Sequence, residues 1–158
     1  MNGLSPDSPP PVEPGSEAER MLVFAVGGQE FALPLGSIVE IAPARTPTPV
    51  PGAEPGVLGI VPFRGAMVTV FDGRLRLGLP GGPAGRAGSM IVLRDSGELI
   101  GLVVDAVARV APIAPAEREP LPAALRLARA DLFLGVAPRR DGGYVLLLDM
   151  AAVLRVAR

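Results

Sequence analysis

Glycine and proline divide the apolar residues of this chain into short runs. The 158 residues include 20 Gly and 19 Pro, and from Met21 onward these separate one apolar stretch from the next. The run Met21–Val26 is too short for a typical globular helix. The Gly27-Gly28 pair that follows it suits a two-residue hairpin turn, because glycine accepts the positive φ that such turns need. Many short strands at close spacing predict an all-β fold with short helices, built as small barrels or a sandwich.

The same signals predict three further hairpins and two short helices. Each hairpin consists of two apolar runs around a turn, namely Val57–Phe63 with Ala66–Phe71, Met90–Arg94 with Leu99–Val104, and Leu132–Ala137 with Tyr144–Leu148. Gln29–Leu33 is expected as the second strand of the first hairpin, and further strands are expected at Ile38–Ile41 and Val107–Ile113. Asp72 and Asp149 are predicted helix caps, the first for a turn ending at Gly78 and the second for a C-terminal helix over 150–157.

Composition divides the chain into a tail and two halves. Residues 1–19 are rich in Pro, Ser, Gly and acidic side chains, so we expect a disordered tail. The glycine-proline loop 78–88 is a natural midpoint between a first barrel over 20–80 and a second over 89–149. Either half alone would have a marginal core. We therefore expect two small barrels fused through a shared hydrophobic seam.

The residue types that are missing exclude several kinds of chemistry. The chain has no Cys and no His, and all 15 basic residues are Arg. Disulfides, Cys/His zinc sites, a Ser-His-Asp triad and Schiff-base lysines are therefore excluded. The net charge of −1 argues against a nucleic-acid binder. The N-terminal residues carry neither the basic region nor the apolar region of a signal peptide, so the sequence predicts a cytoplasmic protein. Because Cys, His and Lys are missing, we also expect no metal and no cofactor.

A binding module fits these observations better than an enzyme. Short strands with few charges leave faces and edges that accept partner proteins. One alternative is a paired-barrel module that senses a small ligand or peptide, which predicts a concave pocket between the halves. A second alternative is a hydrolase that uses only carboxylates such as Asp105 and Asp149, although an Asp at a strand end more often caps a turn. The pair Arg139-Arg140 is expected at a solvated hairpin tip.

Four segments in order resemble the CheW family, the adaptors of bacterial chemosensory arrays. LVFAVGGQEFALPLGSIVEI resembles the family's opening hairpin and the strand that ends in Glu-Ile. GIVPFRGAMVTVFDGRLRLGL resembles its Arg-Gly hairpin, IGLVVDAVARV its Val-Asp-x-Val strand, and FLGVAPRRDGGYVLLLDMAAVL its closing hairpin and helix. The resemblance runs from about residue 20 to 156.

The resemblance implies a fold, a function and partners. The fold would be two five-stranded SH3-like β-barrels followed by a C-terminal helix. The function would be that of a non-catalytic scaffold that couples methyl-accepting chemoreceptors to a CheA-type histidine kinase. One barrel would meet the kinase's regulatory domain, and the groove between the barrels would take the receptor's cytoplasmic hairpin. The protein would thereby associate with receptor arrays at the inner face of the membrane.

The resemblance also assigns candidate binding residues. Glu40 matches the Glu of the Glu-Ile pair and Arg64 matches the Arg of the Arg-Gly hairpin, two positions whose charges pair in the family. The other positions matched to the receptor groove are Ile38, Gly59, Val61, Gly65, Val104, Asp105 and Val107. For these apolar positions, ordinary barrel core is the competing interpretation, because alternate strand residues must point inward.

This sequence departs from the family pattern at four positions. Pro62 stands where the family usually has Asn, and Phe63, Thr69 and Gly73 replace Leu, Pro and Leu. Pro62 lacks a backbone N–H, so it must lie on an edge strand or at a bulge. We therefore expect a divergent adaptor with altered receptor binding, serving a specialised motility or developmental pathway.

Overall fold

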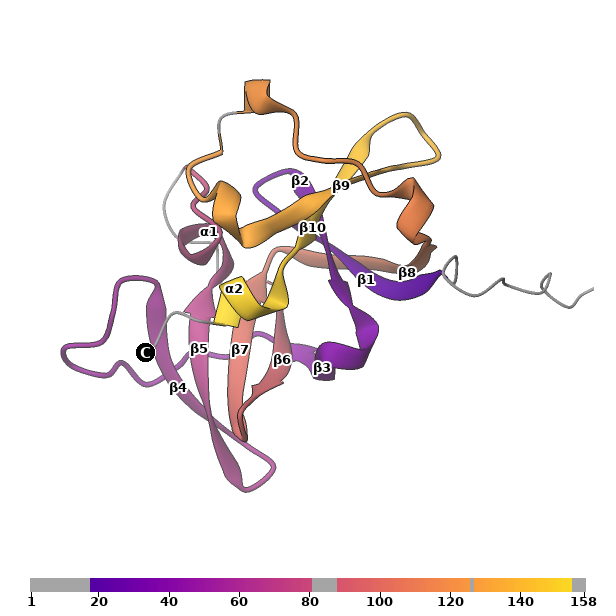
Figure 1. Ribbon diagram of the computed structural model, residues 1–158. Helices are drawn as coiled ribbons and strands as arrows, with labels where there is room; N and C mark the ends of the chain where they lie inside the picture. Colours follow the sequence, from indigo (N-terminus) through magenta and orange to yellow (C-terminus); the bar gives the residue numbers. More distant parts are fainter. Residues whose placement is uncertain (1–17, 81–87, 126, 155–158) are drawn as a thin grey trace, which may run out of the picture.

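Two five-stranded sheets lie side by side in the computed structural model, which describes residues 18–80, 88–125 and 127–154 (Figure 1). In sheet A the strand order is β8-β1-β2-β10-β9, and in sheet B it is β3-β6-β7-β5-β4. Neighbouring strands are antiparallel except for β2–β10 and β5–β7, which are parallel. The architecture is therefore mostly β, as expected from the short apolar runs.

The elements have the following bounds. The strands are β1 (Glu19–Val26), β2 (Gln29–Pro34), β3 (Ile38–Pro43), β4 (Val57–Phe63), β5 (Ala66–Asp72), β6 (Ser89–Asp95), β7 (Glu98–Val104), β8 (Ala106–Ile113), β9 (Phe133–Pro138) and β10 (Tyr144–Leu148). The α-helices are α1 (Gly73–Arg76) and α2 (Met150–Leu154). Single 3-10 turns lie at Leu35–Ser37, Pro115–Glu117, Ala123–Leu125 and Ala130–Leu132.

The four predicted hairpins are confirmed. The antiparallel pairs are β1–β2, β4–β5, β6–β7 and β9–β10. Gly27 and Gly28, in the first turn, have φ values of +61° and +80°, as a two-residue hairpin turn requires. Local turn chemistry therefore sets the pairing within each hairpin.

Most central strands bury both of their faces. In β1, Leu22 and Phe24 belong to a large apolar cluster shared by the two sheets, whereas Met21 and Val23 belong to a smaller cluster within sheet A. Strand β6 of sheet B alternates in the same way between the shared cluster and one inside sheet B. This arrangement explains why the strands read as continuous apolar runs.

The shared cluster joins the two sheets into one body. Its aromatic members Phe24, Phe31 and Phe133 stack in sequence, with ring centroids 5.8 and 6.0 Å apart. Sheet B contributes Phe71 and Ile91, among other residues, to the same cluster. The expected hydrophobic seam is therefore present, and each sheet also curves over its own inner cluster as in an SH3-like barrel. Within the described residues, however, the two edge strands of each sheet do not pair, so neither barrel is closed.

The strands are divided between the sheets differently from the expected halves 20–80 and 89–149. Strands β1 and β2 pair with β8–β10, whereas β3, β4 and β5 pair with β6 and β7. Sheet B is thus inserted between the second and third strands of sheet A. The midpoint boundary was wrong because turn signals report only local pairing, and the parallel contacts β2–β10 and β5–β7 join strands far apart in sequence.

Both predicted helix caps are confirmed. The carboxylate of Asp72 accepts a hydrogen bond from the Leu75 N–H at 3.1 Å, and Oδ1 of Asp149 accepts from the Ala151 N–H at 3.1 Å. Helix α2 is described as far as Leu154, so the rest of the predicted span 150–157 lies outside the described residues. So do most of the predicted tail and of the glycine-proline loop.

A buried arginine ties α2 to sheet B. Arg76, at the end of α1, is only 7% exposed. Its Nε donates to the Val153 carbonyl at 2.9 Å, and its Nη2 donates to the carbonyls of Ala152 and Val153 at 3.0 and 2.7 Å. Burial lowers the pKa of this guanidinium from its ordinary value. Carbonyls near the end of a helix lack hydrogen-bond donors within the helix, and here an arginine from a distant part of the chain supplies the donors.

Replacing Arg76→Met should lower the free energy of unfolding by about 2–3 kcal/mol, because the methionine leaves buried carbonyls without a donor. Urea unfolding measures the loss. The matched control is Arg94→Met on the exposed surface of β6, for which we expect a change within about 0.5 kcal/mol. Equal effects of the two substitutions would contradict the role given to Arg76.

Candidate functional site

An ion pair joins the two open edges of sheet B. Strands β3 and β4 lie at opposite ends of the strand order, and Glu40 of β3 meets Arg64 in the β4–β5 turn. Oε1 of Glu40 and Nη2 of Arg64 are 2.5 Å apart. The side chains are 34% and 70% exposed, so water screens the pair. The pair therefore holds two surface elements at a set angle more than it stabilises the fold.

The backbone at Arg64 is unusual for its residue type. Arg64 and Gly65 both have positive φ, +50° and +79°, as a two-residue hairpin turn requires. Glycine adopts this conformation freely, whereas an arginine there is strained by its Cβ. The guanidinium also lies 5.3 Å from the centroid of the Phe63 ring, a cation–π contact. Two interactions thus orient a side chain that is mostly exposed.

The other candidates near this turn lie mainly inside the protein. Val61 is 2% exposed within the inner cluster of sheet B, and Ile38 packs against the shared cluster. Gly59 has a φ of +145°, and a Cβ there would lie 2.1 Å from the Thr48 carbonyl oxygen. The segment around Thr48 runs antiparallel beside β4 at this point and forms an isolated β-bridge, with backbone hydrogen bonds in both directions between Thr48 and Ile60. Gly59 is therefore required by close backbone packing.

The three candidates from the second half lie at the junction between the sheets. Val104 is fully buried in the shared cluster, and Val107 packs against it. Oδ2 of Asp105 accepts a hydrogen bond from the Gly27 N–H at 2.7 Å and lies 3.9 Å from Nη2 of Arg74. Asp105 therefore fastens the β1–β2 turn to the β7–β8 corner. Its carboxylate meets Gly27 and Arg74, not Glu40 or Arg64.

The structure thus separates the predicted site residues into two kinds. Glu40 and Arg64 come together at the surface, with Gly65 beside them in the turn. Val61, Val104 and Gly59 serve packing, which is the competing interpretation that strand alternation left open. The exposed apolar residues Val39 and Ile41 of β3 flank Glu40 in sequence and are 41% and 39% exposed. Sequence reasoning missed these two, although alternation along the strand places them on the outer face.

A second polar cluster lies on sheet A and was also missed. Both carboxylate oxygens of Glu30 accept hydrogen bonds from Arg109, at 3.0 and 3.1 Å, and Oε1 lies 3.4 Å from Nη1 of Arg139. The hydrogen bonds from Arg109 hold the pKa of Glu30 below its ordinary value. Arg139 also pairs with Asp141 in the β9–β10 turn. The one sequence signal for this cluster was Arg109, an arginine within the otherwise apolar strand sequence AVARVAPI.

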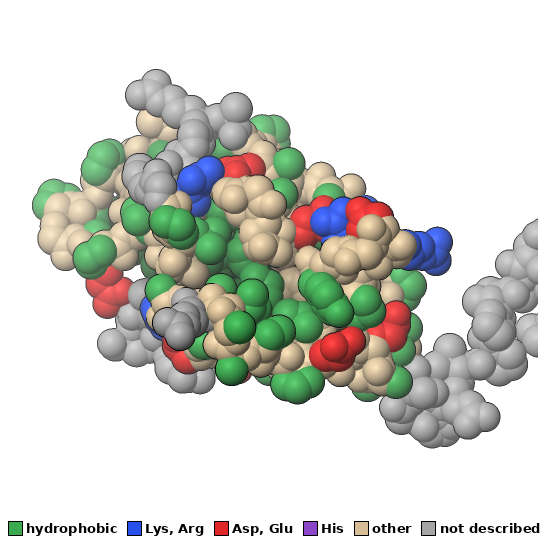
Figure 2. All heavy atoms as spheres, turned by 90° about the horizontal axis from the view of Figure 1, so that it is seen from above, with side chains coloured by type: hydrophobic (Ala, Val, Ile, Leu, Met, Phe, Trp, Pro, Cys, Tyr) green, Lys and Arg blue, Asp and Glu red, His purple; other side chains and the backbone are tan. Residues whose placement is uncertain are grey.

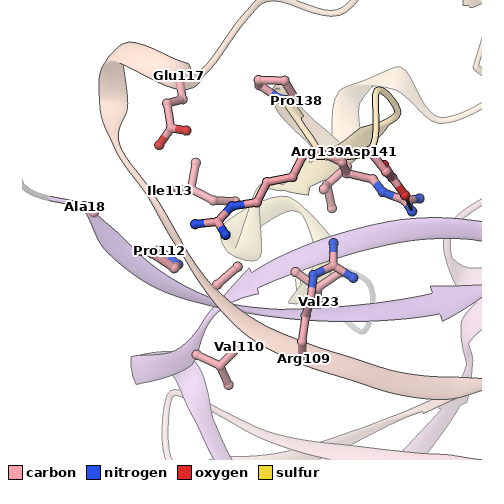
Figure 3. Close-up of a pocket in the computed structure, with 13 residues that line it drawn as sticks. Ala18, Val23, Arg109, Val110, Pro112, Ile113, Glu117, Pro138, Arg139 and Asp141 are labelled. Carbon is pink, nitrogen blue, oxygen red and sulfur yellow. Dashed lines mark hydrogen bonds and ion pairs between the residues drawn. The ribbon is translucent and has the colours of Figure 1, made fainter.

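This cluster borders a hollow of about 640 Å³ between β8 and the β9–β10 turn (Figure 3). Arg109 projects from β8, while Arg139 and Asp141 approach from the turn opposite. The ligand-sensing alternative expected a pocket between the two halves. The hollow lies instead between the two edges of sheet A.

The surface around these sites is largely apolar. Figure 2 shows one face on which many hydrophobic side chains lie among backbone and other side chains, while charged side chains gather in a few places. Residues such as Met67, Leu134 and Tyr144 have large exposed side chains, 49–57% exposed. Exposed apolar side chains of this kind are typical of surfaces that bind other proteins.

Groups for metal binding or catalysis do not come together in the described residues. No group of three or more His, Cys, Asp or Glu there could hold a metal ion. The carboxylates of Asp105 and Asp149, the hydrolase candidates, accept backbone N–H hydrogen bonds at a turn and at a helix start. Also within the described ranges, no helix is long and apolar enough to cross a membrane.

Comparison with known families and structures gives a consistent result. A family model described as CheW-like domain matches residues 20–158. The chain is 29% identical over 136 residues to the chemotaxis protein CheW of Bacillus subtilis (strain 168), covering 86% of each protein. It is 31% identical over 102 residues to the chemotaxis protein CheW of Rhizobium meliloti (strain 1021), covering 65% of this chain and 66% of that protein.

The fold also matches a solved structure. The crystal structure of the scaffolding protein TtCheW from Thermoanaerobacter tengcongensis aligns with a TM-score of 0.76. The alignment covers 89% of this chain and 94% of that one, at 23% sequence identity. The two chains therefore share an architecture.

A double-mutant cycle on Glu40 and Arg64, using Glu40→Gln and Arg64→Met, should give a coupling energy of about 0.2–1 kcal/mol, because both side chains are substantially exposed. Urea unfolding of the four proteins measures it, and added salt should reduce it. A coupling energy above about 3 kcal/mol, as is found when a buried pair is broken, would contradict the surface role.

Glu30 should make the free energy of unfolding depend on pH in the acidic range. The pKa of Glu30 is lowered in the folded protein. The Glu30 carboxylate therefore contributes fully to the free energy of unfolding above the ordinary glutamate pKa, and this contribution is lost as pH falls through the lowered pKa. Glu30→Gln should therefore lose less stability than the parent between neutral pH and about pH 3. Unfolding in urea at both pH values tests this, with Glu98→Gln, at an exposed position of β7, as control. The same pH dependence in the Glu30 variant and the parent would contradict it.

Proposed function

Because the chain belongs to the family of CheW-like proteins, we propose that it is a non-catalytic scaffold of a chemosensory pathway, which couples chemoreceptors to a CheA-type histidine kinase. The observation that carries this proposal is the family match over residues 20–158, a range that includes nearly all of both sheets. The curated relatives are named as chemotaxis proteins and the structural relative as a scaffolding protein.

The proposed mechanism is positioning, not chemistry. A body whose two sheets share one apolar cluster holds surfaces on either sheet at a set distance and orientation. A receptor bound at one surface then influences a kinase bound at another only if the contacts differ between the kinase's states. In this proposal the kinase's regulatory domain binds the outside of one sheet, and the receptor's cytoplasmic hairpin binds near the β3 edge.

Glu40 and Arg64 are the proposed contact residues for the receptor. Support comes from their exposure and from the strained backbone at Arg64, since strain in a turn that glycine would suit is typical of functional positions. The neighbouring Val39 and Ile41 add an apolar surface on the outer face of the same strand, which alternation makes the face opposite Glu40. The remaining groove candidates Ile38, Gly59, Val61, Gly65, Val104, Asp105 and Val107 would shape this surface from within or beside it.

The departures at the β4–β5 hairpin bear on receptor binding. Pro62 is exposed on β4, an edge strand, as the missing backbone N–H demands. A proline here cannot supply the side-chain amide that the family's Asn offers next to the Arg-Gly turn. We propose that this protein's receptor contacts are altered while its kinase contacts are retained, and that it serves a specialised pathway.

Arg64→Glu should weaken binding to a receptor hairpin about tenfold or more, because it places two carboxylates together and removes a donor from the surface. Binding to the kinase should stay within about twofold, since a surface substitution away from an interface has little effect. Calorimetry with each purified partner separates the two, and circular dichroism checks the fold. The swap Glu40→Arg with Arg64→Glu restores the ion pair and should recover part of the binding.

Arg94→Glu is the matched control, with the same charge change at an exposed position of β6. It should leave both affinities unchanged. Unchanged receptor binding by Arg64→Glu would overturn the role of Arg64. Absence of binding to both partners by the parent protein would overturn the proposed function.

A further inference from the structure

The hollow on sheet A lies where the sheet is open. Its walls are the edge strand β8, from Arg109 to Ile113, and the β9–β10 turn, at Pro138 to Asp141. Strand β8 pairs with β1 on one side. In the described part of the chain no strand pairs with its other side, and an unpaired edge offers backbone groups to an additional segment. The hollow is therefore a groove beside a free strand edge.

The floor of this groove is apolar. Val23, Ile113 and Val145 line it, and all three belong to the inner cluster of sheet A. Val110, on the β8 wall, is 43% exposed. Aliphatic and proline side chains of an additional segment would lose contact with water by packing on a floor of this kind. Val23, Ile113 and Val145 are at most 6% exposed, so the groove lies directly over the inner cluster, and the apolar surface that an additional segment would cover is mainly that of Val110.

At the rim of the groove, one arginine has no ion-pair partner among the described residues. Arg109 is paired with Glu30, and Arg139 with Glu30 and Asp141. The carboxylate of Glu117 accepts the Ala114 N–H at 2.7 Å. Arg140, by contrast, makes no ion pair or hydrogen bond with any described residue. Arg140 and Glu117 are therefore the two charged groups of the lining that have no ion-pair partner among the described residues, and Arg140 is the one that attracts an acidic side chain.

The chain's own N-terminal segment enters the fold at this groove. Ala18 lines the hollow and is labelled at its edge in Figure 3. Residues 1–17, which precede it, contain Asp7, Glu13 and Glu17 but no Arg or Lys. They also contain five prolines, together with Leu4 and Val12. Their charge is opposite to that of Arg140, and their apolar residues suit the floor.

The segment is also long enough to reach along the groove. The β8 wall from Arg109 to Ile113 spans roughly 16 Å, at about 3.3 Å per strand residue. An extended proline-rich chain advances about 3.1 Å per residue, so about five residues match that length and the others remain to make the turn from Ala18. Covalent attachment at the rim also gives the segment an effective concentration of about millimolar for a short linker.

We propose that residues 1–17 dock into this groove, with acidic side chains against Arg140 and with proline and aliphatic side chains on the apolar floor. The docked segment covers the free edge of β8. It thereby excludes other strands from that edge, including those of a second copy of this chain. The inference concerns sheet A and does not depend on the receptor surface of sheet B.

Paramagnetic broadening in the full chain tests the proposal directly. The chain has no Cys, so Ser8→Cys supplies a single site for a nitroxide spin label. The label should broaden the amide signals of Val110 and Ala111 and spare Thr69, on β5 of the other sheet. The broadening should persist when the labelled protein is diluted into unlabelled protein, and should weaken with added salt. Broadening that spreads evenly over both sheets, or that vanishes on dilution, would overturn intramolecular docking.

Charge variants identify the pairing. In the labelled chain, Arg140→Glu should reduce the ratio of docked to undocked segment about two- to fivefold, as expected for one exposed ion pair. The triple variant Asp7→Asn, Glu13→Gln, Glu17→Gln should reduce it at least as much. Arg94→Glu, on the other sheet, should leave it unchanged. An unchanged ratio in the Arg140 variant would overturn the assigned pairing. An equal loss with Arg94→Glu would show that only net charge matters and would overturn the site.

Discussion

The apolar cluster shared by the two sheets is the interaction on which the rest of the structure depends. Each sheet has only five strands, and a domain half of this size buries too little surface to be stable alone. Strands β1 and β6 contribute one face to the shared cluster and the other to the inner cluster of their own sheet. The protein is therefore one body with several outward surfaces.

The polar contacts fix where the surface elements lie on that core. Arg76 holds α2 against sheet B through backbone carbonyls, and Asp105 fastens the β1–β2 turn to the β7–β8 corner. Glu40 and Arg64 link the two edges of sheet B, which no backbone ladder joins in the described residues. These contacts are few and specific. They set angles between elements, which is what a scaffold needs in order to hold partners in register.

The strands and turns could be predicted from the sequence, because their signals are local. Gly27-Gly28 and Arg64-Gly65 mark hairpin turns, and Asp72 and Asp149 mark helix starts. The division of strands between sheets could not, because the parallel contacts that decide it join distant segments. The Glu40–Arg64 ion pair was predicted from the family resemblance, and the two side chains are in contact in the structure. The roles of Gly59 in packing and of Asp105 in anchoring a turn could not be predicted, because each depends on a segment distant in sequence, around Thr48 and Gly27 respectively.

The central claim is that one rigid body carries two partners at once. Light scattering coupled to size-exclusion chromatography can weigh a mixture of this protein, a CheA-type kinase and a soluble receptor hairpin. The account predicts a single complex that contains all three, in which the kinase and the hairpin stay together only when this protein is present. Two separate binary complexes that exchange in competition, or partners that remain together without this protein, would contradict it.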